Sequence, residues 1–220
     1  LRDNPGLPKD QRNASTAPAV NPYNHQLHLY DKNQPENLAF LRRLRTVMNP
    51  YGAAAVGEVG DSQRGLEIMG EYTSGNDLMQ MCYAFEFLAP EPLTAPFVVE
   101  TFDRLAKAAP EGWACWAFSN HDVVRHVSRW AKHGVSQDAL ARQAGALLLS
   151  FQGSICLWQG EELGQTDTEL SFEELTDPQG INFWPEPIGR DNTRTPMVWD
   201  DSASGGFSSG TPWLPVKPEQ

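Results

Sequence analysis

The strongest constraint on the fold is a stretch in which a short apolar run turns abruptly polar. Residues 113–118 read W-A-C-W-A-F, and residues 119–122 read S-N-H-D. An apolar run without alternation is typical of a strand that is buried on both faces. The polar residues must then be accommodated at its end, where an unpaired carboxylate costs several kcal/mol. Asp122 therefore either caps a following helix or has a chemical role, and this stretch alone favours the cap.

A second stretch repeats the pattern. Residues 53–61 read A-A-A-V-G-E-V-G-D, so a small apolar run delivers Glu58 between two glycines, which permit close approach of backbone or ligand. Two buried strands that each end in an acid are typical of the C-terminal face of a parallel α/β barrel. Two converging carboxyl groups are also the minimum apparatus for glycoside hydrolysis.

These two stretches resemble signature regions of the α-amylase superfamily, glycoside hydrolase family 13. Within it, the chain is most similar to bacterial α-glucosidases and oligo-1,6-glucosidases. Three further segments match in the family's order: L-R-D-N-P at residues 1–5, Q-G-E-E-L-G at 159–164, and G-R-D-N-T-R-T-P-M-V-W-D at 189–200. The resemblance covers nearly the whole chain.

The remaining sequence alternates between strand and helix patterns, which predicts an α/β fold with parallel strands and right-handed crossovers. Strands are expected at 53–59, 78–88, 113–118 and 154–158, and helices at 35–48, 94–109 and 135–151. A closed (β/α)8 TIM barrel needs eight strands. The resemblance implies that these four are strands 5 to 8, the C-terminal half of the barrel.

The predicted organisation is one partial catalytic domain, residues 1–220, truncated at both ends. Residues 1–34 form a loop after strand 4, residues 35–164 form the β/α core, and residues 165–220 are loop-rich. In the first loop, His25, His28 and Tyr30 either line a sugar site or are solvated.

The resemblance assigns chemical roles to the strand ends. Glu58 matches the acid/base position, and Asp122 matches the acid that orients sugar hydroxyls and stabilises the transition state. His121 matches a residue that donates a hydrogen bond to the sugar. The alternatives are a strand-end ion pair for Glu58 and a structural role for His121. The family's nucleophile is an aspartate just upstream of Leu1, so we expect the chain alone to be inactive.

Three further residues complete the predicted substrate site. Arg190 matches an arginine that holds the terminal glucose, although an arginine that ties two loops together is an equal alternative. Phe118 lies two places before Asn120, and both are expected near the sugar, where an aromatic ring can stack.

Composition narrows the class of ligand. The net charge is −11 and the pI about 4.8, which argues against nucleic acid and fits a neutral oligosaccharide. No apolar run approaches the roughly 20 residues that span a bilayer, so no membrane partner is expected. Cys82, Cys115 and Cys156 have no metal-type spacing and are expected to be inert thiols, which favours a cytoplasmic location. We assign no cofactor and no metal, and the oligomeric state stays open.

The sequence therefore predicts a retaining α-glucosidase that hydrolyses, or transfers, terminal α-linked glucose from short oligosaccharides. An oligo-1,6-glucosidase or a trehalose-type hydrolase shares every motif and is the nearest alternative. A non-catalytic barrel scaffold is the alternative of another class, and the presence of Glu58, His121, Asp122 and Arg190 argues against it.

Overall fold

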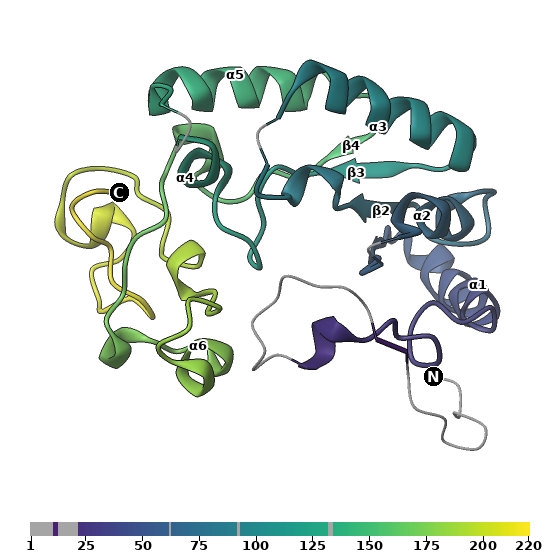
Figure 1. Cartoon of the computed structure of the whole chain (residues 1–220), viewed down its shortest axis with the longest axis horizontal. Coiled ribbons are helices and arrows are strands. Elements are labelled where there is room, and N and C mark those ends of the chain that lie inside the picture. Colours follow the sequence, from purple (N-terminus) through teal and green to yellow (C-terminus); the bar gives the residue numbers. More distant parts are fainter. Residues whose placement is uncertain (1–10, 13–21, 62, 92, 132–133) are drawn as a thin grey trace. The chain divides into compact units, whose positions relative to one another are not determined.

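The computed structural model describes residues 11–12, 22–61, 63–91, 93–131 and 134–220 (Figure 1). The segment 1–5 and most of the predicted first loop lie outside the described residues. The chain divides into two compact units, Leu1–Tyr83 with Leu105–Ala114, and Ala84–Arg104 with Cys115–Gln220. Among the described helices, none has the length and apolar character needed to cross a membrane.

The first unit is built on a parallel pair of strands, β1 (Val56–Glu58) and β2 (Met81–Ala84). Gly57 stands opposite Cys82, and a Cβ at Gly57 would lie 2.5 Å from the Cys82 Sγ, so this position excludes a side chain. On its other side, the β2 residue Cys82 donates its N–H to the Trp113 carbonyl at 3.3 Å. The strands of this unit are therefore parallel and closely packed, as the sequence predicts.

Two helices accompany these strands, α1 (Asn37–Met48) and α2 (Gly65–Thr73). They lie beside each other in Figure 1, and Asn37 Nδ2 donates to the Tyr72 hydroxyl at 3.0 Å. The predicted helix 35–48 is confirmed, and Leu41 is its buried residue. A short 3-10 helix, Asn49–Tyr51, and the left-handed Gly52 end it.

Two predictions in this unit are wrong. The stretch 53–59 is not a strand buried on both faces. Val56 is 46% exposed and Glu58 is exposed, because the side chains of this stretch are small and β2 is the strand with which β1 pairs in this unit. The predicted strand 78–88 holds four strand residues and then turns into a 3-10 helix, Glu86–Leu88. The buried side of the strand carries Cys82 and Ala84.

The second unit contains a longer alternation of helices and strands. α3 (Ala95–Ala108, whose last turn belongs to the first unit) precedes β3 (Ala114–Trp116), which pairs in parallel with β4 (Ser154–Ile155). Between the strands lie α4 (His126–Trp130) and α5 (Gln137–Leu149), and Ser136 caps the start of α5 by accepting from the Ala139 N–H. The helix predictions 94–109 and 135–151 are confirmed, whereas the predicted strand 154–158 is shorter than expected.

The core of the second unit is aromatic. The β3 side chains are all buried and Trp116 is fully enclosed, so the predicted burial of 113–118 holds for residues 114–118 but is wrong for Trp113, which is 45% exposed. The rings of Phe87, Phe102 and Phe151 contact Trp116 at centroid distances of 5.0–5.9 Å, and Phe118 joins the same cluster through Phe87 and Phe151. This cluster holds the end of β3 in place.

After β4 the chain is loop-rich, as predicted, but it contains one short helix, α6 (Pro178–Phe183), that the sequence analysis missed. Further short 3-10 helices lie at Pro22–His25 in the first unit and, in the second unit, at Glu161–Leu163, Phe172–Glu174, Asp191–Thr193 and Ala203–Gly206.

The three cysteines are free thiols. Cys82 and Cys115 are buried strand residues, and Cys156 is half-buried one residue after β4. Burial raises the pKa of Cys115 to about 11, so this thiol stays protonated at neutral pH and is unreactive.

Candidate active site

Asp122 does not cap the helix that follows it. α4 begins at His126, and its N-cap position is Arg125, which makes no side-chain cap. Instead, the Asp122 N–H donates to Asn120 Oδ1 at 2.8 Å, so Asn120 forms a turn that presents the Asp122 side chain. The prediction that Asp122 caps this helix is therefore wrong, and its carboxylate does not bond to the start of α4.

Two arginines converge on a single oxygen of Asp122. Arg190 Nη1 donates to Asp122 Oδ1 at 3.0 Å, and Arg194 Nη2 donates to the same oxygen at 2.8 Å. Arg194 Nε also donates to the His121 carbonyl at 2.8 Å. The second oxygen, Oδ2, lies 3.5 Å from His121 Nε2. Asp122 keeps 37% of its side chain exposed and His121 51%, so both can be reached from solvent.

A buried carboxylate holds Arg190 from the other side. Arg190 donates from Nε to Asp177 Oδ2 at 2.9 Å and from Nη2 to Asp177 Oδ1 at 2.8 Å, a bidentate fork. The Asp177 side chain is fully buried. The hydrogen bonds from Arg190 lower the pKa of Asp177 to about 2, and the same pairing raises the pKa of Arg190 above its ordinary value. Arg190 therefore does tie two loops together, which is one of the two predicted alternatives.

Two glycines allow these loops to approach each other. A Cβ at Gly189 would lie 2.8 Å from the Gly180 Cα, so the segment before Arg190 fits against α6 only when this position has no side chain. The buried Asp191 fixes the same crossing, because it accepts from the backbone N–H groups of Thr176 at 2.6 Å and Asp177 at 2.7 Å. The G-R-D motif thus builds a rigid loop contact.

A second buried arginine joins the surrounding loops. Arg125 is 1% exposed and donates from Nη1 to the Gln159 carbonyl at 2.5 Å and from Nη2 to the Thr193 carbonyl at 3.1 Å. Its backbone N–H donates to Asp167 Oδ1 at 3.1 Å. Burial lowers the pKa of Arg125 and raises that of Asp167, although each charge opposes the shift of the other. This buried pair connects the ends of β3 and β4 to the loop that carries Arg190.

Phe118 is a core residue in this structure. Its side chain is fully buried, and its ring meets the rings of Phe87, Trp130 and Phe151 at centroid distances of 5.3–5.8 Å. The aromatic neighbours occupy its faces, so the predicted stacking of Phe118 on a sugar is not supported. The other predicted site residues of this unit, Asn120, His121, Asp122 and Arg190, come together.

Sequence reasoning missed several residues of this constellation. Asp177 and Arg194 complete the contacts around Arg190 and Asp122, and Arg125 with Asp167 supports them. Two signals were present: T-D-P at residues 176–178 is an N-cap followed by proline at the first helical position, and Arg194 lies within the G-R-D-N-T-R motif.

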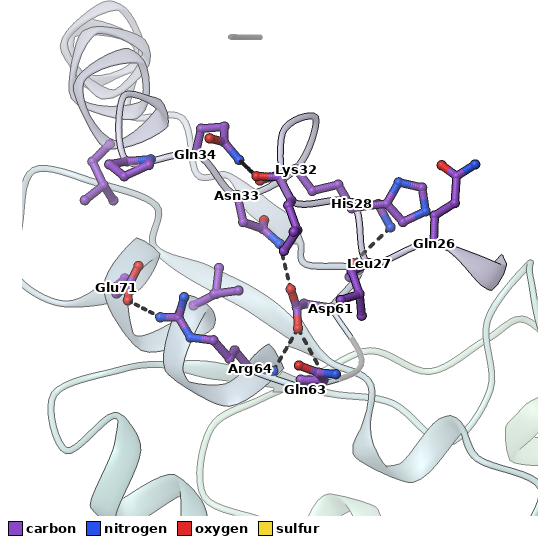
Figure 2. Close-up of a pocket in the computed structure, with 15 residues that line it drawn as sticks. Gln26, Leu27, His28, Lys32, Asn33, Gln34, Asp61, Gln63, Arg64 and Glu71 are labelled. Carbon is purple, nitrogen blue, oxygen red and sulfur yellow. Dashed lines mark hydrogen bonds and ion pairs between the residues drawn. The ribbon is translucent and has the colours of Figure 1, made fainter. Parts of the chain in front are cut away.

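Glu58 belongs to the first unit, where it ends β1 opposite Tyr83 with its side chain exposed. Two residues beyond it begins a pocket of about 580 Å³, drawn in Figure 2. The chain after β1 and the start of α2 form one wall, with Asp61 and Arg64. Residues 26–35 form the other, with Lys32 and Asn33.

Within this pocket, Asp61 links both walls. It accepts from Asn33 Nδ2 at 3.4 Å and from the backbone N–H groups of Gln63 and Arg64 (Figure 2). Burial raises the pKa of Asp61, but these hydrogen bonds outweigh burial, so the pKa lies below its usual value. His28 lines the pocket, and its ring nitrogens contact Asp31 and the Tyr23 carbonyl.

Comparison with known proteins gives the family. The model of a family described as "Alpha amylase, catalytic domain" matches residues 3–220. The chain belongs to this family. The resemblance inferred from the sequence motifs is therefore confirmed.

Two curated relatives show which enzymes of the family this chain resembles. The chain is 64% identical over 217 residues to a "Probable alpha-glucosidase" of Rhizobium meliloti (strain 1021), with 98% of the chain and 39% of the relative covered. An "Oligo-1,6-glucosidase" of Heyndrickxia coagulans is 31% identical, with 85% of the chain and 40% of the relative covered. The chain thus spans about 40% of the length of these relatives.

Solved structures agree with this placement. The crystal structure of an alpha-glucosyl transfer enzyme, XgtA, matches with a TM-score of 0.84 and 48% identity over 100% of this chain and 40% of that one. The trehalose-6-phosphate hydrolase of Bacillus licheniformis matches with a TM-score of 0.72 at 23% identity over 87% of this chain and 40% of that one, and supports the fold alone.

Proposed function

We propose that the full-length protein containing this chain is a retaining α-glucosidase that removes terminal α-linked glucose from short oligosaccharides. The observation that carries the proposal is the Asp122 carboxylate, presented at the end of β3 and held on one oxygen by Arg190 and Arg194. An exposed acid that two arginines hold in place suits hydroxyl recognition, because its oxygens stay aligned beside a developing positive charge. The 64% identical relative named an α-glucosidase supports the substrate class.

The proposed mechanism divides the work between the strand ends. Glu58 donates a proton to the glycosidic oxygen as the bond breaks and then takes a proton from the water that attacks the glucosyl-enzyme. Asp122 and His121 bind sugar hydroxyls, and Arg190 contributes from the loop that follows α6. The nucleophile is proposed to lie outside residues 1–220, at the end of the preceding strand, so this chain alone is expected to be inactive.

The proposal also covers the fold of the full-length protein and the kind of substrate it binds. The four strands are proposed to be strands 5 to 8 of a (β/α)8 barrel, with residues 1–220 forming part of one catalytic domain. The substrate is a neutral oligosaccharide. The relative named oligo-1,6-glucosidase supports α-1,6 bonds as a second candidate linkage, and the 48% identical glucosyl transfer enzyme supports transfer of glucose to acceptors other than water.

The experiment that tests the mechanism is Glu58→Gln in the full-length protein. Loss of the proton donor should lower kcat/KM for maltose by about 10³-fold or more. The loss should be far smaller for 2,4-dinitrophenyl α-glucoside, whose leaving group needs no proton. Added azide should then accelerate turnover and give the α-glucosyl azide, since azide needs no general base and two successive inversions at the anomeric carbon restore the α configuration. Glu67→Gln is the matched control, because Glu67 is an exposed glutamate of the same unit on α2.

Three outcomes would contradict the proposal. Near-normal turnover of maltose by Glu58→Gln removes Glu58 from the acid/base role. An equal loss for both leaving groups points to a role other than proton donation. Binding of maltose without any turnover by the unmodified full-length protein supports the scaffold alternative. Rates with maltose, isomaltose and trehalose decide the linkage.

A further inference from the structure

We propose that Asp177 is a positioning residue that keeps Asp122 aligned for the sugar by fixing the plane of Arg190. This inference rests on the proposed function of Asp122. Asp177 is not among the residues to which the proposed mechanism gives a role, and it lies 55 positions after Asp122 in the sequence. Its connection to Asp122 is visible in the contacts of Arg190 alone.

The Arg190 guanidinium is held on two edges. A guanidinium has five N–H donors in a rigid plane. Nε and Nη2 are committed to the two oxygens of Asp177, at 2.9 and 2.8 Å. A bidentate fork fixes both the position and the plane of the group, which a single hydrogen bond does not. Nη1 then projects toward Asp122 Oδ1, 3.0 Å away.

Asp177 is itself immobilised before it holds Arg190. Its backbone N–H donates to Asp191 Oδ2 at 2.7 Å, and its Oδ1 accepts from the Gln179 N–H at the start of α6. Its Oδ2 also accepts from the Arg190 backbone N–H at 2.9 Å. The arginine is thus bound to Asp177 through both backbone and side chain, and the close Gly180–Gly189 contact brings these segments together.

As a consequence, the two oxygens of Asp122 have different neighbours. Both arginines donate to Oδ1, and the His121 ring lies beside Oδ2 at 3.5 Å. Rotation of the carboxylate is therefore opposed from one side, and Oδ2 is the oxygen presented to a sugar hydroxyl. Without the fork, Arg190 is a long side chain with one exposed partner, and such pairs hold geometry weakly. A misplacement of about 1 Å can cost on the order of 10²-fold in rate.

The test compares four variants of the full-length protein with one α-glucoside substrate: Asp177→Asn, Arg190→Ala, their double mutant, and Asp122→Asn. Asp177→Asn should lower kcat by about 10- to 100-fold with a smaller change in KM. In the Arg190→Ala background, Asp177→Asn should cause no more than about a twofold further loss, because Asp177 acts through Arg190. A purely structural role would instead give additive losses and lower the folded fraction.

Glu174→Gln is the matched control. Glu174 lies three positions before Asp177, and among the described residues its carboxylate bonds to Lys217 Nζ and to the Ser171 N–H rather than to Arg190 or Asp122. It should leave kcat unchanged. If Asp177→Asn fails to fold, Arg190→Lys replaces it, since lysine keeps the charge but cannot form the fork.

The outcomes separate this inference from the proposed function. Loss of activity in Asp122→Asn with normal kcat in Asp177→Asn and Arg190→Lys overturns the positioning role and leaves the function intact. Normal activity in Asp122→Asn overturns the function itself. Additive losses in the double mutant also overturn the positioning role.

Discussion

The two strand ends that carry the proposed acids share a sequence pattern and differ in structure. β3 is enclosed, and its Trp116 is fully buried within the aromatic cluster. β1 has Val56 46% exposed and Glu58 exposed. The acid after β3 is fixed by two arginines, whereas Glu58 ends a short strand whose nearest anchor is its pairing with β2.

The difference shows that burial follows side-chain volume and neighbours more than it follows the apolar pattern. The run before Asp122 carries Trp116 and Phe118, and large aromatic side chains bury the most area and pack against several elements at once. The run before Glu58 carries alanines and Val56, which bury little. Identical patterns therefore predict a strand in both places but not an equally stable one.

The sharpest way to break this comparison is to truncate one side chain in each strand. Trp116→Ala should lower the free energy of unfolding by about 3–5 kcal/mol, because it empties a closed core site and removes the bond from Trp116 Nε1 to the Gln152 carbonyl. Val56→Ala should cost under about 1 kcal/mol at its half-exposed site. Urea unfolding followed by far-UV circular dichroism measures both, and losses of similar size would show that β1 is as enclosed as β3.

A smaller effect on stability is expected from the ionised Asp177, which binds Arg190 in the second unit. The pKa of Asp177 is about 2 in the folded state and about 3.9 in an unfolded chain. The stability that this group contributes is therefore fully present above about pH 4 and is lost as the pH falls toward 2. The shift corresponds to about 2–3 kcal/mol.

Asp177→Asn should remove this pH dependence. The difference in unfolding free energy between the unmodified protein and the variant should shrink as the pH is lowered from 5 to 3. Glu174→Gln, which removes the half-buried Glu174–Lys217 ion pair, provides the reference. A difference that stays constant over this range would mean that Arg190 does not hold Asp177 ionised in solution.

The parallel α/β class, the four strand positions and the three long helices could be predicted from the sequence, since each rests on a local pattern. α5 is the clearest example, because Ser136 caps it and Ala144 and Leu148 lie on its buried face. The strand lengths could not be predicted. Residues 78–88 alternate well enough for a long strand, yet the chain leaves the sheet after Ala84 and enters a 3-10 helix.

In the site, motif resemblance brought together residues 120–122 and Arg190 but could not find Asp177. Its role depends on Arg190, which lies 13 positions after Asp177 and 68 positions after Asp122, and no local pattern predicts contacts over such separations. The prediction for Phe118 was wrong for a different reason. Closeness to Asn120 along the chain suggested a sugar contact, but the surrounding aromatic rings enclose the Phe118 side chain in the core.

α2 was missed because glycines interrupt its helical pattern, and this gives the smallest predicted effect. Glycine in a helix interior normally costs about 1 kcal/mol relative to alanine. At Gly70, however, a Cβ would lie 2.5 Å from the Ala109 Cβ and 3.0 Å from its Cα, so the neighbouring backbone would have to move. Gly145, inside α5 of the second unit, has no heavy atom within 4 Å of the same added carbon among the described residues.

Alanine should therefore have opposite effects at the two glycines. Gly145→Ala should raise the free energy of unfolding by about 0.5–1 kcal/mol through helix propensity alone. Gly70→Ala should lower it by about 1 kcal/mol, because overpacking against a fixed backbone outweighs the same propensity gain. Thermal unfolding of the two variants in parallel measures the sign, and a gain at Gly70 would mean that α2 can move away from Ala109 at little cost, leaving the first unit more loosely packed than the second.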